Sequence, residues 1–141
     1  MKPLIFVYDA GSKNSGSTVM RIFQLSQIAE IAGIVNKIVS NEFDFTGISE
    51  SILLFSKNCY KWASENNDLI TKIRNRNILC YDPLDNIFEK DMSSYFDIIL
   101  ASSITQYQSL SKYCERVQPI LHHHDFFLNS QVMKKTKTIA Y

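Results

Sequence analysis

The stretch FVYDAGSKNSGST, residues 6–18, leads from an apolar run through two glycines and a set of hydroxyl side chains. Residues 4–8 are continuously apolar rather than alternating, which is typical of a strand covered on both faces of a parallel sheet. The residues after the loop have the spacing of one helical stripe, namely Ile22, Leu25, Ala29 and Ala32, with Gly33 placed to end the helix. A hydroxyl residue of the loop is expected to cap this helix.

Strand and helix patterns then alternate along the chain. The further predicted strands are residues 37–40, 52–55, 78–81, 97–101 and 117–121, and the further helices are residues 60–74 and 105–113. This alternation predicts an α/β fold, with a three-layer, Rossmann-like, doubly wound and mainly parallel sheet of about six strands.

The alternation of strand and helix patterns stops near the end of the sequence. The predicted domain fills residues 1–128, and the following NSQVMKKTKT is polar and rich in lysine before the final IAY. We interpret residues 129–141 as a linker and the start of a second domain, or as a frayed tail.

The composition argues against several classes of protein, among them nucleic-acid-binding, disulfide-bonded and membrane-spanning proteins. The 141 residues include 15 lysines and arginines against 14 aspartates and glutamates, so there is no long-range attraction for a polyanion, and nucleic acid is not an expected partner. Cys59, Cys80 and Cys114 form no CxxC pair, which favours reduced, structural thiols and a cytoplasmic location. The apolar N-terminal run is too short for a signal peptide or a bilayer span. A peripheral membrane contact through the basic run TKIRNRN, residues 71–77, is a weaker interpretation than a solvated helix end.

The loop after the first strand lies where ligands bind in a doubly wound sheet, beyond the carboxyl ends of the strands. Gly11 and Gly16 have the glycine spacing of a P-loop, but Ser17 stands where a P-loop has lysine, which disfavours a nucleoside triphosphatase. A hydroxyl-rich loop of this length also fits a flavodoxin phosphate site, although Trp62 falls within a predicted helix rather than on a loop beside a flavin ring. A plain strand-to-helix turn is the third interpretation.

Three longer stretches carry a resemblance to a known family. They are GSKNSGSTVMRIFQLSQIAE (residues 11–30), FSKNCYKWASENNDLITKIRNRNILCYDPLDN (residues 55–86) and YFDIILASSITQYQSLSKYCERVQPILHHHD (residues 95–125). In this order they resemble the N-terminal half of GT-B glycosyltransferases, and most closely the retaining enzymes of family four. The resemblance covers nearly the whole chain and rests on the common order of the motifs.

The resemblance implies site residues at successive strand ends. The family has a small-residue loop followed by an arginine, a lysine that ends a middle strand, a D-x-x-D stretch, a serine pair and a closing polar turn. The matching positions are Gly16 with Arg21, Lys57, Asp82 with Asp85, Ser102 with Ser103, and His124 with Asp125.

The resemblance also implies which of these residues are catalytic and which contact the donor. Asp85 and Asp82 are the candidate catalytic carboxylates, although Asp82 before proline is also a common way to open a turn. For Arg21, a solvated surface charge is the structural alternative to stabilising a phosphate. The expected contacts to the donor are Gly11, Ser15, Gly16, Ser17, Arg21, Lys57, Ser103, His124 and Asp125.

The three consecutive histidines at residues 122–124 suggest a metal site at first sight. Adjacent residues of an extended chain point in opposite directions, and no cysteine or carboxylate pair with zinc spacing accompanies the histidines. We therefore predict no metal site, and no cofactor apart from a nucleotide-sugar that acts as substrate.

The sequence thus predicts the acceptor-side half of a glycosyltransferase. Its expected partners are a glycan or lipid-linked acceptor and a C-terminal donor-binding domain in the same or another chain. Because the resemblance assigns most of the donor contacts to that second domain, this chain alone is expected to be inactive. The alternatives are a flavodoxin-like module that binds a flavin or a protein partner, and a degenerate nucleotide-binding regulator.

Overall fold

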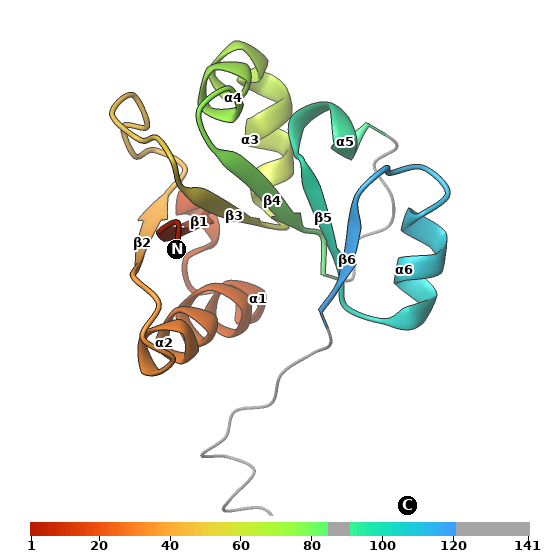
Figure 1. Ribbon diagram of the computed structural model, residues 1–141, viewed down its shortest axis with the longest axis horizontal. Helices are drawn as coiled ribbons and strands as arrows, with labels where there is room; N and C mark the ends of the chain where they lie inside the picture. Colours follow the sequence, from red (N-terminus) through yellow and green to blue (C-terminus); the bar gives the residue numbers. More distant parts are fainter. Residues whose placement is uncertain (85–90, 121–141) are drawn as a thin grey trace, which may run out of the picture.

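The computed structural model describes residues 1–84 and 91–120, which form a six-stranded sheet with helices on both faces (Figure 1). All neighbouring strands run parallel, in the order β2-β1-β3-β4-β5-β6. The strands are β1 (Leu4–Tyr8), β2 (Asn36–Ser40), β3 (Ile52–Ser56), β4 (Ile78–Asp82), β5 (Ile98–Ala101) and β6 (Val117–Pro119). The predicted α/β class and the parallel sheet of about six strands are confirmed.

The direction of winding reverses between β1 and β3. The chain leaves β1 for β2 on one side, returns to β3 on the other side of β1, and then proceeds strand by strand to β6. Such a reversal is the switch point of a doubly wound sheet, and ligands bind there beyond the carboxyl ends of the strands. The loops that follow β1 and β3 flank this point.

One face of the sheet is covered by a continuous helical run, residues 16–31. The run consists of α1 (Gly16–Thr18), the π-helical segment η2 (Val19–Phe23) and α2 (Gln24–Ile31). Its buried apolar side chains pack against one face of four strands, in a cluster made of Ile22, Ala29, Phe6, Leu54, Cys80 and Leu100. Gly33 follows with φ of 73°, a conformation that suits glycine, and it ends the helix as predicted.

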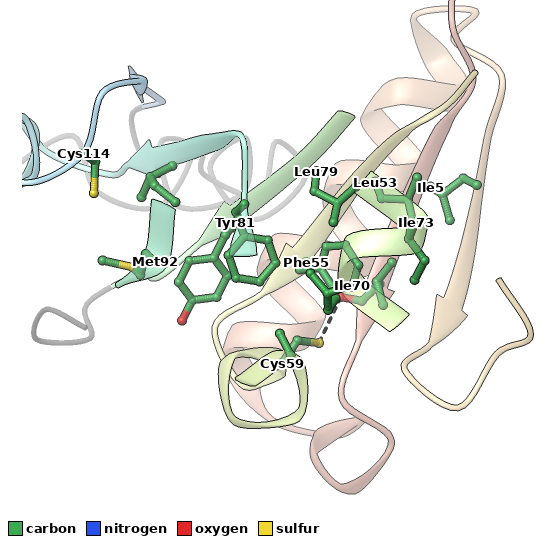
Figure 2. Close-up of a cluster of buried hydrophobic side chains, with 14 of the residues drawn as sticks. Ile5, Leu53, Phe55, Cys59, Ile70, Ile73, Leu79, Tyr81, Met92 and Cys114 are labelled. Carbon is green, nitrogen blue, oxygen red and sulfur yellow. Dashed lines mark hydrogen bonds between the residues drawn. The ribbon is translucent and has the colours of Figure 1, made fainter. Parts of the chain in front are cut away.

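The opposite face carries the remaining helices (Figure 1). They are α3 (Cys59–Glu65), α4 (Asn67–Arg74), α5 (Met92–Tyr95) and α6 (Ile104–Leu110). Figure 2 shows the larger core cluster on this side, in which Phe55 and Tyr81 of the central strands lie among side chains of these helices. The central strands are therefore buried on both faces, which is why their sequences read as continuous apolar runs.

The predicted helix over residues 60–74 is two helices, and this prediction was wrong. Asn66 interrupts it with φ of −120° and ψ of 40°. The Asn66 side-chain amide donates to the Trp62 carbonyl at 2.8 Å, which also accepts from the Asn66 backbone amide at 3.0 Å. Asparagine favours such local bonds over a helix interior, so α3 ends and α4 begins in a new direction.

The predicted strands begin and end within two residues of the observed ones. The helix predicted over residues 105–113 is shorter, because α6 ends at Leu110 and two turn-type bonds follow, from Lys112 N–H to Ser109 O and from Tyr113 N–H to Leu110 O. The predicted boundary at residues 128 and 129 lies outside the described residues.

Candidate functional site

The loop after β1 ends in a capped helix start. Ser15 is the cap: its hydroxyl oxygen accepts from the Thr18 amide at 3.2 Å and its hydroxyl lies 2.9 Å from Thr18 Oγ1, to which it donates. Gly16 and Ser17 occupy the first two helical positions, whose amides have no acceptor within a helix. The loop therefore presents amide donors at the carboxyl edge of the sheet.

The two glycines of this loop are glycines for different reasons. A Cβ atom at Gly11 would lie 3.2 Å from Asp9 Oδ2, so the fold itself disfavours a side chain there. A Cβ atom at Gly16 would meet nothing within 4 Å. Internal packing does not require glycine at position 16, and the space beside it is open.

Arg21 and Asp82 form a buried ion pair that joins the first helical run to the end of β4. Arg21 Nε donates to Asp82 Oδ2 at 2.6 Å, and each side chain is only 2% exposed. The second oxygen, Asp82 Oδ1, accepts from the Leu84 amide at 3.0 Å. The alternative prediction, that Arg21 is a solvated surface charge, is therefore wrong, because its guanidinium is buried.

The bonding of this pair is incomplete on the arginine side. Within residues 1–84 and 91–120, neither Nη1 nor Nη2 of Arg21 has a hydrogen-bond acceptor, although both atoms are buried. Unsatisfied donors of a buried cation are costly, which gives them a strong preference for an oxyanion or water. Asp82 has both oxygens engaged, and this suits a carboxylate that positions its neighbours better than one that accepts a substrate proton.

The serine pair after β5 serves two separate purposes. Ser103 caps α6, since its hydroxyl oxygen accepts from the Gln106 amide at 3.1 Å, and its hydroxyl hydrogen remains able to donate outward. Ser102 is buried, and its hydroxyl lies 3.1 Å from Leu84 O and 2.8 Å from Gln106 Oε1. Of these two serines, only Ser103 is exposed.

Three residues of this edge were missed by the sequence interpretation. Asn41 Nδ2 donates to Asp9 Oδ1 at 3.0 Å, and Asn41 Oδ1 accepts from the Ala10 amide at 3.0 Å, so these contacts hold the Asp9 carboxylate at the switch point. Gln106 is the third and links β4 to β5. Asp9 could have been predicted, because an acidic residue directly follows the first strand. The sequence around Asn41 and Gln106 has no feature that marks them as site residues.

The other predicted residues are placed only in part. Lys57 directly follows β3, and its carbonyl accepts from the Tyr81 hydroxyl at 3.0 Å. Gly11, Ser15, Gly16, Ser17, Lys57, Asp82 and Ser103 thus come from loops or strand ends on the same edge of the sheet. Asp85, His124 and Asp125 lie outside the described residues.

The cysteines are free and buried. Burial raises the pKa of the Cys59 thiol to about 12 and that of Cys80 to about 11. Both groups therefore stay protonated near neutral pH and are poor nucleophiles. Trp62 lies on α3, as predicted, and it is half-buried and stacks on Phe55 of the core with ring centroids 6.2 Å apart.

A polar cavity of about 250 Å³ lies at the opposite, amino edge of the sheet. Arg74 and Asp97 form an ion pair in its wall at 2.6 Å, and Arg74 Nη1 also donates to the Ser94 carbonyl at 3.0 Å. These bonds connect α4 to α5 and to the residue before β5, so the polar side chains of this cavity have a structural role.

Among residues 1–84 and 91–120, no cluster of three or more histidine, cysteine or acidic side chains could hold a metal ion. In the same residues, no helix has both the length and the apolar character needed to cross a bilayer. No family model matches the sequence, and neither the curated proteins nor the solved structures searched contain a significant match.

The buried ion pair gives a direct prediction for stability. Arg21→Met and Asp82→Asn should each lower the free energy of unfolding by about 3–5 kcal/mol, because each leaves the partner buried without its counter-charge. The double variant should lose less than the sum of the two, since it leaves no lone charge. Urea unfolding of the four proteins measures the coupling.

The control is Lys61→Met, which breaks an exposed pair, Lys61 with Glu65 at 3.8 Å. It should change stability by less than about 0.5 kcal/mol. Strictly additive losses at Arg21 and Asp82 would show that the two side chains do not depend on each other.

Proposed function

We propose that this chain is the acceptor-side domain of a GT-B glycosyltransferase, which moves a sugar from a nucleotide-sugar to a glycan or a lipid-linked acceptor in the cytoplasm. The observation that carries the proposal is the buried Arg21–Asp82 pair. It joins the helix of the glycine-containing loop to the D-x-x-D stretch after β4, and these are two of the motifs on which the family resemblance rests.

The proposed donor contacts follow from the donors at this edge. When the glycosidic bond of a nucleotide-sugar breaks, negative charge develops on the departing diphosphate, and fixed N–H groups stabilise it. The amides of Gly16 and Ser17 are oriented by the helix start. The Nη atoms of Arg21 lack acceptors within the described residues but are buried, so in this proposal the side chains around Arg21 move aside when the donor binds. Asp82 balances the charge of Arg21, so the contribution is one of directed hydrogen-bond donors rather than of net charge.

The proposed catalytic carboxylate is Asp85, because both oxygens of Asp82 are committed to Arg21 and Leu84. Asp82 then has a positioning role: it accepts a hydrogen bond from the Leu84 amide, and Asp85 is the next residue in the sequence. In this proposal Lys57, Ser103, His124 and Asp125 complete the wall of the cleft that faces the donor.

A flavodoxin-like module is the second candidate, and one observation favours it. The order of the first five strands, 2-1-3-4-5, is that of flavodoxin-like sheets, in which the flavin sits at the β1/β3 switch point. The stacking of Trp62 on Phe55 argues against it, because that face of the indole is then not free for a flavin ring. Purified protein with flavin absorbance near about 450 nm would decide for this candidate.

The first test of the proposal is turnover. We expect no transfer when this chain alone is mixed with uridine nucleotide-sugars and glycan or lipid acceptors, since the groups that hold most of the donor are assigned to the second domain. Addition of a donor-binding domain should give transfer, followed by release of the nucleotide diphosphate. Robust transfer by this chain alone would overturn the assignment of donor binding to another domain.

The second test compares Gly16 with Gly47, two glycines at which a Cβ atom would meet nothing within 4 Å and whose φ is not positive. Gly16→Ala should leave the free energy of unfolding unchanged or raised by up to about 1 kcal/mol, because a Cβ atom fits there and alanine favours a helix. It should nevertheless weaken the binding of uridine diphosphate about tenfold, since the new methyl group occupies the space beside the loop amides.

The matched control is Gly47→Ala. A Cβ atom at Gly47 also meets nothing within 4 Å, but this glycine lies in the connection from β2 to β3, next to Thr46, whose carbonyl contacts Arg76 before β4. Gly47→Ala should change neither stability nor binding. Equal affinities of the Gly16 variant and the unchanged chain, measured by NMR titration, would contradict the proposed phosphate contact.

A further inference from the structure

The turn that follows β4 is held in an unfavourable backbone conformation. Leu84 has φ of 54°, in the left-handed region that a bulky side chain rarely adopts. Such a conformation persists only where the surrounding structure fixes it at several points. Leu84 is fixed at both of its backbone groups: its amide donates to Asp82 Oδ1 at 3.0 Å, and its carbonyl is contacted by Ser102, which follows β5, and by Gln106 of α6.

Gln106 of α6 makes the shorter of the two side-chain contacts to that carbonyl. Its Nε2 atom donates to Leu84 O at 2.5 Å, and its Oε1 atom accepts from the Ser102 amide at 2.6 Å. The side chain thus bridges the exits of β4 and β5. The orientation of the amide group follows from this bonding, because a flipped amide would set oxygen against the Leu84 carbonyl and N–H against the Ser102 amide.

Ser102 is the second side chain within reach of the Leu84 carbonyl. Its hydroxyl lies within hydrogen-bond distance of both Leu84 O and Gln106 Oε1, but a hydroxyl has a single hydrogen to donate. If that hydrogen goes to Gln106 Oε1, the 2.8 Å contact, the Leu84 carbonyl depends on Gln106 Nε2.

The bonds form a continuous chain from α6 to the first helical run. Gln106 holds the Leu84 carbonyl, the Leu84 amide holds Asp82 Oδ1, and Asp82 Oδ2 holds Arg21 Nε. We propose that Gln106 is a positioning residue, whose side-chain amide fixes the strained turn at residues 82–84 and through it the orientation of the Arg21–Asp82 pair. The link from this turn to catalysis rests on the proposed function, because Asp85 follows Leu84 directly in the sequence.

The test compares three variants by NMR of the folded chain. Gln106→Ala removes the contact, and Gln106→Glu keeps the size of the side chain but replaces the Nε2 donor with an ionised oxygen that repels the Leu84 carbonyl. Gln108→Ala is the matched control, because Gln108 lies on the same helix and is exposed. The readouts are hydrogen exchange of the Leu84 amide and the resonance of the Arg21 Nε–H group.

We expect at least about tenfold faster exchange at Leu84 in both Gln106 variants, corresponding to at least about 1.4 kcal/mol of lost protection against local opening. The Arg21 Nε–H resonance should shift in both variants, while the protection of Leu53 in the central strand stays unchanged. In the Gln108 variant, both the exchange of the Leu84 amide and the Arg21 Nε–H resonance should match those of the unchanged chain. A role limited to packing would leave Gln106→Glu like the unchanged chain, and a role limited to holding Ser102 would leave Arg21 unmoved.

Either of those two results would overturn the proposal, as would unchanged exchange at Leu84. If Gln106→Ala does not fold, Gln106→Glu decides the matter, because its shape is preserved. These readouts require no transfer of sugar, so a failure here is distinct from a failure of the glycosyltransferase assignment.

Discussion

The organisation of the carboxyl edge depends on one interaction, the buried ion pair between Arg21 and Asp82. A guanidinium that is 2% exposed needs a counter-charge within reach, and Asp82 supplies it only while the helical run of residues 16–31 lies against the end of β4. Arg21 lies within a π-helical segment, a distortion that is frequent at functional sites. The pair therefore determines where the loop amides stand relative to the strand ends.

The polar residues of this edge divide into two groups. Some are used by the fold: Ser15 caps a helix, Ser102 is buried between strand exits, and Gly11 leaves room for Asp9. Others keep bonding capacity that the described fold does not use, namely the amides of Gly16 and Ser17, the hydroxyl hydrogen of Ser103 and the terminal nitrogens of Arg21. The second group is the basis of the proposed contact with a phosphate-bearing donor.

The strands of the sheet could be predicted from the sequence, because a strand that is buried on both faces has a continuous run of apolar residues, as in β3. Gly33 could likewise be predicted to end a helix, since a positive φ is a local requirement. The pairing of Arg21 with Asp82 could not, because 61 positions separate them and no local pattern marks either side chain as buried. Gln106 was missed for the same reason: its partner Leu84 lies 22 positions away on another strand end.

We propose that the carboxyl edge of this sheet contacts the nucleotide diphosphate of a sugar donor. The most direct measurement is an NMR titration of the isotope-labelled chain with a uridine diphosphate sugar, which reports the affected amides residue by residue. We predict weak binding, with shifts at residues 11–17, at Ser103 and at the Arg21 side chain. Shifts confined to the polar cavity of Arg74 and Asp97 at the amino edge, or no shifts at all, would contradict the account.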